Sequence, residues 1–528
     1  MRSHFLWSIL PIHIGIYFLA RYYGNGFFNF YIITVPLTLI GLRDVFQRKH
    51  TILRNYPIAG HFRYLLESIR PEIQQYFVER FDDGRPFSRE QRSIVYQRAK
   101  GELDTSAFGT QHDVYLAGAE WLEHSIDVPK HLDEGENRIK IGNHQCKQPY
   151  NASRFNISAM SYGSMSKTAI ESLNWGAKLG GFFHNTGEGG ISPYHKKHGG
   201  DLCWQIGTGY FGCRNADGTF NEKMFEEKSR DEQVKLIELK LSQGAKPGHG
   251  GMLPGAKVNQ EVADIRAVEV GKDVNSPPTH SAFSGPKGLV RFIQHLRELS
   301  GGKPVGFKLC LGKKHEFFSV CKAMIELDIY PDFITVDGAE GGTGAAPREF
   351  SNSLGTPLND GLNFVHNALV ATGIREKIVL ICSGKVVDAF NLVSKFSLGA
   401  DICNSARGMM FAIGCIQALR CNSNNCPAGV ATQDPKLYKL VDVDSKSKRV
   451  ANYHRKTLEE MEHLITASGV TRIRDIKKSH IKRRIGPGKV MNYEELYPKL
   501  VMNSLIDGTY SGRWRKIWDE ASSDTFRV

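Results

Sequence analysis

Short apolar runs alternate with amphipathic stretches of helical period between residues 155 and 403, a pattern that predicts buried strands joined by helices. The predicted strands cover residues 155–160, 182–185, 203–206, 236–241, 306–311, 333–336, 378–382 and 400–403. The predicted helices between them include residues 167–179, 286–299, 316–327, 359–371 and 387–396. Because strands that alternate with helices pair in parallel, this part of the chain predicts a parallel sheet.

The number of these units distinguishes a closed sheet from an open one. Eight strand–helix units match a (β/α)8 TIM barrel more closely than an open doubly wound sheet. The sequence has no Gly-x-Gly-x-x-Gly motif that follows a first strand and opens a helix, as dinucleotide-binding folds do. We therefore predict an α/β fold, a (β/α)8 TIM barrel with an N-terminal transmembrane hairpin and helical flanking segments.

The first fifty residues have a different pattern from the rest. Two apolar runs, 5–20 and 27–42, are each slightly shorter than the ~20 residues that cross a bilayer comfortably. Basic residues lie mainly outside the two runs, at Arg2, Arg43, Arg48 and Lys49, with only Arg21 between them. Because cytoplasmic segments of membrane proteins are enriched in positive charge, we expect a hairpin with both ends in the cytoplasm.

This hairpin predicts a protein of the inner (cytoplasmic) membrane whose catalytic domain faces the cytoplasm. A secretory signal peptide is one alternative, but no small-x-small cleavage site follows the first run, and a second apolar run comes next. A buried helical hairpin in a soluble protein is the other. The predicted organisation is an anchor over 1–50, a helical or irregular cap over 51–150, the barrel over 151–430 and a basic helical extension over 431–528.

The net charge and the cysteine content indicate which binding partners and which cellular compartment suit this protein. The net charge is +13, and the basic excess is strongest over 444–490. A solvated tail explains such a run most simply, while attraction to an anionic membrane or an acidic redox partner is a second reading. Nucleic acid fits poorly because no recognised binding motif accompanies the charge. The 10 cysteines do not form a disulfide framework, which indicates a reducing compartment with one dedicated cofactor site.

The 53 glycines cluster between residues 160 and 345 and fall repeatedly just after predicted strands. Examples are Ser-Tyr-Gly at 161–163, Thr-Gly-Glu-Gly-Gly at 186–190 and Asp-Gly-Ala-Glu-Gly-Gly-Thr-Gly at 337–344. Loops after the strands of a barrel share its carboxyl face, where active sites assemble. The sequence therefore predicts an active site built from several of these loops.

The loops after the seventh and eighth predicted strands fit the phosphate of a flavin mononucleotide (FMN). FMN barrels commonly seat the phosphate there, on backbone N–H groups at a helix N-terminus. The first loop contains Ser383, Gly384 and Lys385, and the second contains Ala406 and Arg407. Glycine allows close backbone approach, and lysine or arginine supplies charge. A surface charge is the alternative for either basic residue taken alone.

Two further features fit the flavin ring and the substrate. Met160, Ser161 and Gly163, after the first predicted strand, would present backbone groups to the edge of the isoalloxazine ring. Lys308 lies inside an apolar strand, where a charged side chain should be paired or functional because burying an isolated charge is costly. Flavin N1 or a substrate carboxylate would suit it.

Three cysteines lie close together in the sequence. Cys415, Cys421 and Cys426 stand six and five residues apart, and Pro427 follows the last of them. Three thiolates on one turn can converge on a metal centre, and Cys-Pro is familiar from iron–sulfur ligation. Structural zinc would need a fourth ligand. Zinc with a distant ligand such as Cys403, or three buried cysteines with no metal, remain the alternatives.

Residues 154–433 resemble the synthase domain of glutamate synthase. The blocks that carry the resemblance are Ser-Ala-Met-Ser-Tyr-Gly-Ser-Met-Ser from 158, Asn-Thr-Gly-Glu-Gly-Gly from 185, Gln-Gly-Ala-Lys-Pro-Gly-His-Gly-Gly-Met-Leu-Pro-Gly-Ala-Lys-Val from 243, Ser-Pro-Pro-Thr-His from 276, Gly-Gly-Thr-Gly-Ala-Ala-Pro from 341, and the cysteine block. These motifs are long and unusual, and they cover over half of the chain. The hairpin, together with Arg-Glu-Gln-Arg-Ser and Phe-Gly-Thr-Gln, looks like the stand-alone, membrane-anchored bacterial members.

The resemblance implies an oxidoreductase acting on CH–NH2 groups, with FMN in the barrel mouth and a 3Fe–4S cluster held by Cys415, Cys421 and Cys426. In the family, ammonia and 2-oxoglutarate form an imine, and reduced flavin delivers hydride to give L-glutamate. The electron donor would be a ferredoxin-like protein or a reductase subunit. The implied catalytic residues are Lys308, Glu188 and Lys246, with Glu188 handling protons. Gly341 and Gly342 join the cofactor-binding residues.

The chain also departs from the family pattern. It begins Met-Arg-Ser and runs into the apolar hairpin, so we expect no glutamine amidotransferase activity. After Lys308, Leu-Cys-Leu-Gly-Lys-Lys-His replaces the usual small and acidic residues, and His249 is a further departure. Two alternatives therefore stay open: a membrane-linked FMN dehydrogenase that oxidises an amino or hydroxy acid, and a non-catalytic flavoprotein subunit that relays electrons.

Overall fold

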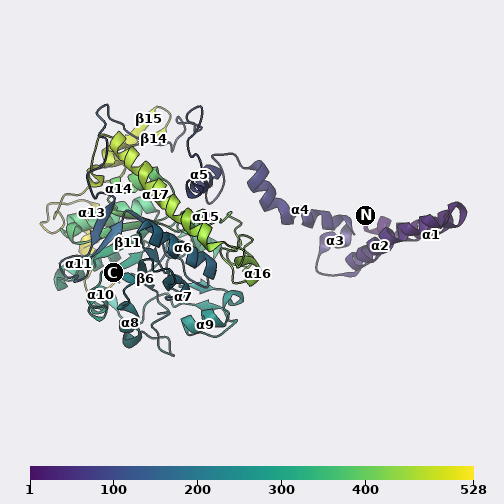
Figure 1. The fold of residues 1–528 in the computed structure, drawn as a ribbon, viewed down its shortest axis with the longest axis horizontal. Coiled ribbons are helices and arrows are strands. Elements are labelled where there is room, and N and C mark those ends of the chain that lie inside the picture. The colour runs from purple at the N-terminus through teal and green to yellow at the C-terminus, as the bar shows by residue number, and fades with distance from the viewer. The chain divides into compact units, whose positions relative to one another are not determined.

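The computed structural model describes residues 1–528, which form two compact units, Met1–Pro86 and Phe87–Val528. The larger unit contains a closed barrel of eight parallel strands (Figure 1). In chain order the strands are β4 (Phe155–Ile157), β5 (His184–Asn185), β6 (Leu202–Ile206), β7 (Val234–Lys240), β10 (Val305–Leu309), β11 (Phe333–Asp337), β12 (Val379–Ser383) and β13 (Ile402–Ser405). The predicted α/β barrel is therefore confirmed, and each strand overlaps a predicted one.

Both faces of the strands are covered, which explains why the sequence identifies them so clearly. All residues of β6, β11 and β13 are buried, because helices cover the outside and side chains fill the inside. The barrel closes where β13 pairs with β4, with Cys403 opposite Phe155 and Ser405 opposite Ile157. Its strands therefore all end at one carboxyl face.

Helices connect successive strands and agree with the predicted ones. The connecting helices are α6 (Lys167–Gly180), α7 (Pro193–Lys196), α8 (Glu222–Ser229), α9 (Gln260–Arg266), α10 (Gly285–Leu299), α11 (Lys314–Leu327), α12 (Arg348–Ser353), α13 (Leu358–Ala371) and α14 (Ala389–Ser397), and α15 (Arg407–Ala412) follows the last strand, β13. The longest connection, between β7 and β10, also contains the ribbon of β8 (Met252–Leu253) and β9 (Val274–Asn275) and the 3-10 turn η3 (Gly255–Lys257). The turn η4 (Arg375–Lys377) precedes β12.

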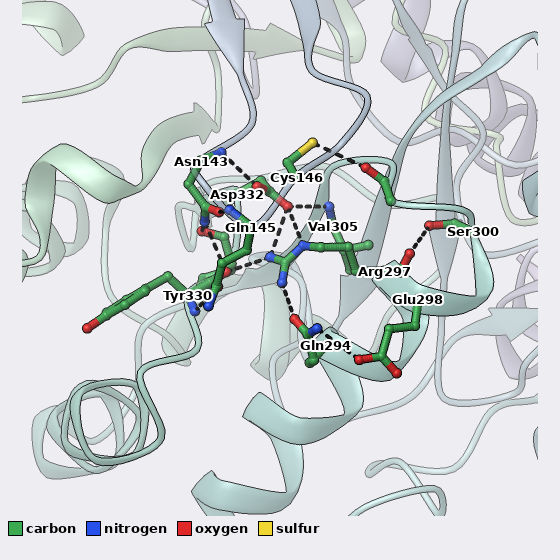
Figure 2. A network of polar contacts seen from close by, with 12 residues as sticks. Asn143, Gln145, Cys146, Gln294, Arg297, Glu298, Ser300, Val305, Tyr330 and Asp332 are labelled. Carbon is green, nitrogen blue, oxygen red and sulfur yellow. Dashed lines mark hydrogen bonds and ion pairs between the residues drawn. The ribbon is translucent and has the colours of Figure 1, made fainter.

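A hairpin covers the amino end of the barrel. Its strands are β2 (Arg138–Ile141) and β3 (Tyr150–Ser153), and Ile141 and Ala152 pack into the apolar layer formed by the first residues of the barrel strands. Figure 2 shows the polar network around the loop of this hairpin. In it, the Asp332 carboxylate accepts hydrogen bonds from Arg297 Nη2 at 3.0 Å and from the Asn143 N–H at 2.9 Å. Both charged side chains are almost fully buried. The network fastens the hairpin loop to the barrel.

Segments before and after the barrel pack on its outside. Helix α17 (Val443–Ala467) packs on α6 and on α5 (Arg89–Lys100), while β1 (Glu120–Leu122), β14 (Ile481–Gly486) and β15 (Lys489–Asn492) form an antiparallel sheet. The remaining elements are α16 (Pro435–Tyr438), η5 (Ile473–Asp475), η6 (Lys478–His480), α18 (Tyr493–Leu496) and α19 (Arg513–Glu520). The C-terminal residues rest on α11, where His315 lies 3.2 Å from the carbonyl oxygen of Phe526. His315, one of the departures noted above, therefore has a structural partner.

The smaller unit is helical. It consists of α1 (Arg2–Tyr23), η1 (Asn25–Phe30), α2 (Tyr31–Phe46), α3 (Thr51–Asn55), α4 (Ala59–Ile73) and the π-helical turn η2 (Gln74–Val78). Residues 2–23 and 25–46 each form a helical stretch of 22 residues with a mean hydropathy of 1.4, long and apolar enough to cross a membrane. In the most apolar 18 residues of each stretch, only 11% and 6% of the residues are buried. Length and composition alone do not distinguish a membrane span from a signal sequence.

Candidate active site at the carboxyl end of the barrel

The residues predicted for the flavin and substrate lie at or just beyond the carboxyl ends of the barrel strands. They are placed strand by strand as follows: Met160, Ser161 and Gly163 follow β4, Glu188 follows β5, Lys246 follows β7, Lys308 lies in β10, Gly341 and Gly342 follow β11, Ser383 ends β12, Gly384 and Lys385 follow β12, and Ala406 and Arg407 follow β13. Because the strands are parallel and the barrel is closed, one face of the molecule carries all of them. What each residue does there remains a prediction.

Asp337, the last residue of β11, joins three strands at this face. The hydroxyl group of Ser383 donates to its Oδ1 atom at 2.6 Å, and the Gly244 N–H donates to Oδ2 at 2.8 Å. Lys308 Nζ lies 3.3 Å from Oδ2. Burial opposes the charge of Lys308, but the carboxylates of Asp337 and Glu238 outweigh it and raise the pKa of the lysine. Lys308 is therefore a buried cation with an internal partner.

A second buried carboxylate lies deeper in the barrel. Glu238 accepts hydrogen bonds from the side chains of Asn185 at 2.8 Å, Gln205 at 2.6 Å and Thr335 at 2.6 Å. It also adds to the negative charge that holds Lys308 protonated. Such a fully hydrogen-bonded layer stiffens the floor beneath the mouth of the barrel.

Glu188 is surrounded by positive charge. Its Oε1 atom lies 2.9 Å from Lys240 Nζ, and the side chains of both residues are largely buried. Burial alone would raise the pKa of Glu188, but Lys240, Arg266 and Lys246 together lower it. The carboxylate is therefore ionised at neutral pH, and three cations against one anion leave an excess of positive charge here.

Lys246 is a deeply buried cation with a lowered pKa. It donates a hydrogen bond to the carbonyl oxygen of Ala345 at 2.7 Å and is only 2% exposed. Burial lowers its pKa to about 8, an effect that the charge of Glu188 partly opposes. The protonation of Lys246 therefore changes within an ordinary working pH range.

Arg266, which the sequence interpretation above does not include, connects the β4 loop to this cluster. It is buried on α9, donates to the carbonyl oxygen of Tyr162 at 2.8 Å and to the hydroxyl group of Ser161 at 3.2 Å, and lies over the Phe211 ring. Burial lowers its pKa to about 10, so it remains a cation. Its sequence signal is an arginine on the apolar face of an amphipathic helix directly after a glycine-rich loop.

The loops meet closely enough that glycine is required at Gly187. Its φ angle is +65°, and an added Cβ atom would lie 2.6 Å from the backbone nitrogen of Ser161. Any other residue would therefore push the β4 and β5 loops apart. The absence of a side chain at Gly187 keeps Glu188 and Ser161 in one site.

The loops predicted to bind phosphate lie beside each other after β12 and β13. Gly384 and Lys385 have φ angles of +136° and +53°, so the chain turns sharply at this point. Arg407 donates to the carbonyl oxygen of Glu340 at 2.6 Å and lies over the ring of Phe87 at 4.6 Å. Burial lowers the pKa of Arg407 to about 10. The Oδ1 atom of Asn404, on β13, is buried without a hydrogen-bond partner in the protein.

The three clustered cysteines lie in a coiled segment after α15. Burial raises the pKa of Cys415 to about 12, and Cys421 and Cys426 contribute to that increase. The segment is fastened on one side because Tyr96 donates to the carbonyl oxygen of Cys415 at 2.6 Å. No group of three His, Cys, Asp or Glu side chains is placed closely enough to hold a metal ion. The metal assignment therefore remains a prediction.

Comparison with known proteins identifies the family. Residues 107–471 match the family model described as the conserved region in glutamate synthase. A glutamate synthase large subunit-like protein of Bacillus subtilis, YerD, is 39% identical over 513 residues, which cover 89% of this chain and 97% of that protein. The chain belongs to the glutamate synthase family.

Other members of the glutamate synthase family match over a shorter part of their length. The archaeal-type glutamate synthase (NADPH) of Thermotoga maritima is 31% identical over 322 residues, 61% of this chain and 60% of that protein. The large chain of glutamate synthase (NADPH) of Bacillus subtilis is 33% identical over 321 residues, 60% of this chain but only 20% of that protein. The match therefore spans about three fifths of the archaeal-type enzyme and about one fifth of the large chain.

Solved structures resemble the chain only weakly. A mutant of flavocytochrome b2 with sulfite bound has a TM-score of 0.41 and 10% identity, and covers 84% of this chain and 97% of its own. A mandelate oxidase mutant with (S)-mandelic acid has a TM-score of 0.40 and 10% identity, and covers 69% and 86%. These values add nothing to the fold described above.

Proposed function

We propose that this protein is a membrane-tethered flavin oxidoreductase that converts 2-oxoglutarate, or a related 2-oxo acid, and ammonia into L-glutamate or the corresponding amino acid. The observation that carries the proposal is the excess of positive charge around Glu188, within a barrel of the glutamate synthase family. Three buried cations at a barrel mouth suit a small dianionic substrate, because carboxylates form strong charge-assisted hydrogen bonds.

FMN is the cofactor that the residues at the mouth fit. The loops after β12 and β13 would hold the phosphate, through backbone N–H groups at Gly384 and Lys385 and the charge of Arg407. The unpartnered Asn404 Oδ1 is a buried acceptor beneath these loops, and such atoms usually await a ligand or a water molecule. Met160, Ser161 and Gly163 would lie along the ring edge, with Gly341 and Gly342 on the opposite loop. When bound, FMN supplies the hydride chemistry.

The protein's own groups would bind and orient the substrate. Lys240, Lys246 and Arg266 would hold the carboxylates, and Glu188 would keep these cations together. Lys308, charged and fixed by Asp337, would stabilise negative charge near the reacting centre without rearranging. With a pKa of about 8, Lys246 is also suited to hold or release a proton, while the ionised Glu188 can accept one.

Cys415, Cys421 and Cys426 would hold a 3Fe–4S cluster. Three cysteines in one segment supply the sulfur ligands that such a cluster needs, and Cys421 and Cys426 both act on Cys415. The nearby ammonium group of Lys257, fixed by the carbonyl oxygens of Ser164 and Ala431, would favour thiolates over thiols. When bound, the cluster relays single electrons from a protein donor of the ferredoxin or reductase type.

Residues 2–46 would tether the enzyme to the inner (cytoplasmic) membrane, with the barrel in the cytoplasm. Large apolar side chains are exposed along both helices, including Trp7 at 81%, Leu10 at 68% and Ile32 at 73%. A lipid environment would cover them, whereas a buried hairpin would already be covered by protein. The exposure of these apolar side chains therefore favours a hairpin surrounded by lipid.

The overall reaction is tested with anaerobically reduced protein. We expect 2-oxoglutarate plus ammonium to reoxidise the flavin and to yield L-glutamate, measured by flavin absorbance and chiral amino-acid analysis. Other 2-oxo acids with ammonium identify the preferred chain length. If no 2-oxo acid reoxidises the protein, while an amino or hydroxy acid bleaches the oxidised flavin, the enzyme is a dehydrogenase and the proposal is wrong.

The cluster is tested separately with Cys421→Ser. We expect this variant to lose the iron–sulfur absorbance and most of its iron while it keeps a stoichiometric flavin, because Cys421 is not among the residues proposed to hold FMN. Cys146→Ser is the control, since Cys146 is also half-buried but lies at the opposite end of the barrel. Unchanged iron content in Cys421→Ser would contradict the cluster assignment.

A further inference from the structure

Helix α4 carries an apolar face that no other part of residues 1–86 covers. Large apolar side chains recur at three- and four-residue spacing, the period of one face of a helix. Their exposed fractions are 63% for Phe62, 55% for Leu65, 45% for Leu66, 40% for Ile69 and 39% for Ile73. Every residue from 61 to 74 is exposed, and the face continues into η2, where Phe77 is 85% exposed. Exposed apolar faces of this size indicate a binding surface.

The start of α4 is fixed to the end of α2, the second candidate membrane helix. Asp44 is only 2% exposed, accepts a hydrogen bond from the Ile58 N–H at 3.0 Å and lies 2.9 Å from His61 Nε2. Gly60 packs so closely against α3 that an added Cβ atom would lie 2.8 Å from Leu53 Cδ2. The start of α4 is therefore packed against the end of the hairpin and held there by hydrogen bonds.

The charges around this face have the sign that anionic lipid attracts. Residues 43–73 contain six basic residues, Arg43, Arg48, Lys49, Arg54, Arg63 and Arg70, against three acidic ones, Asp44, Glu67 and Glu72. Arg63 pairs with Glu67 at 3.5 Å on the polar side of α4. A basic segment next to a membrane span, with an apolar helical stripe, is the chemistry of helices that lie in the membrane interface.

We propose that α4 lies in the cytoplasmic membrane interface, with its apolar face among the acyl chains and its arginines among anionic headgroups. The inference rests on the membrane tether proposed above. It adds a second point of membrane attachment, directly before the barrel unit. A second copy of this chain and the barrel's own surface are the competing occupants of the face. Neither accounts for the continuity of α4 with the hairpin or for the basic excess beside it.

The test places a photo-crosslinking benzophenone amino acid at single positions of the full-length protein, reconstituted in vesicles of phosphatidylglycerol and phosphatidylethanolamine. On irradiation we expect Ile69 and Phe62 positions to give several-fold more phospholipid adduct than the Glu67 position, measured by intact-protein mass spectrometry. Glu67 is the matched control because it lies on the polar side of the same helix. In vesicles of phosphatidylcholine alone, the adduct at Ile69 should decrease; an equal yield would overturn the preference for anionic lipid.

Position Leu10, in α1, separates this inference from the tether itself. If Leu10 gives lipid adducts and neither Ile69 nor Phe62 does, the tether holds and the interfacial helix is wrong. Adducts at Ile69 with a second copy or with the same chain also overturn the inference and identify the occupant. Absence of lipid adducts at all three positions overturns both. Adducts at Ile69 and Phe62 without any at Leu10 support α4 as a lipid-binding helix and contradict the spanning hairpin.

Discussion

At the scale of single residues, Lys246 gives the clearest pH dependence. Burial lowers its pKa to about 8, so the side chain is a cation below that pH and becomes neutral above it. If it holds a substrate carboxylate, KM for the 2-oxo acid rises as the pH passes about 8. Below that pH, Lys246→Gln should have a KM about 10- to 100-fold higher than the wild type, because a charge-assisted hydrogen bond is lost. Since glutamine does not titrate, the KM of this variant should not change as the pH passes about 8.

The measurement is KM for 2-oxoglutarate across the pH range, with Lys303→Gln as the matched control. Burial also lowers the pKa of Lys303 to about 8, but this lysine precedes β10 at the amino end of the barrel and donates to the carbonyl oxygens of Ser229 and Asp231. The control should keep the wild-type profile. If Lys246→Gln keeps it as well, Lys246 does not bind the substrate.

Some of these residues could be predicted from the sequence, and others could not. Lys308 could be predicted as paired or functional because it is a lysine inside an apolar strand, yet its partner Asp337 is on the next strand and becomes apparent only when the barrel closes. Lys240 and Glu238 stand two positions apart in β7 and therefore point to one side, a signal that the sequence interpretation did not use. Arg266 comes from a separate helix, and no local pattern reveals that it reaches Ser161.

At the scale of elements, the hairpin at the amino end of the barrel stabilises the fold without taking part in the site. Replacing Arg297 by Met leaves the Asp332 carboxylate buried without its cation, which costs about 3–5 kcal/mol. For a unit of this size we expect the melting temperature to fall by roughly 3–5 °C. Differential scanning calorimetry measures the change, and flavin content should not alter. Arg291→Met, at an exposed position of the same helix, should melt like the wild type; if both variants do, the ion pair contributes nothing.

Elements were predictable where one local pattern determines them. The strands could be located because both faces are buried, and α6 because Ser166 caps its start and Gly181 ends it in the left-handed conformation. The outer sheet could not be predicted, since β1 pairs with β14 across more than 350 residues of sequence, Glu120 opposite Arg483. Nor could the role of β2 and β3, which depends on the barrel end that they cover.

At the scale of the whole molecule, the chain combines an enzyme barrel with an N-terminal pair of apolar helices. The sequence predicts both parts, because an apolar hairpin and a strand–helix alternation are strong patterns. The compact units divide after Pro86, a point that no change of composition marks. Residues 89–150 belong with the barrel unit because α5 packs on α15 and α17, a long-range contact that composition cannot reveal.

The proposed membrane tether leads to a prediction about where the enzyme resides in the cell. The double substitution Ile33→Lys and Leu37→Lys puts two charges into α2, and each costs about 2.5–3.5 kcal/mol at the centre of a membrane helix. We expect the wild-type protein to stay in the membrane pellet after alkaline carbonate extraction and the variant to appear largely in the supernatant. The control, Ile33→Leu with Leu37→Ile, keeps the hydropathy and should stay in the pellet. Because the barrel unit has its own core, the extracted variant should retain its flavin. Extraction of the wild-type protein by carbonate would instead show that the hairpin does not span the bilayer.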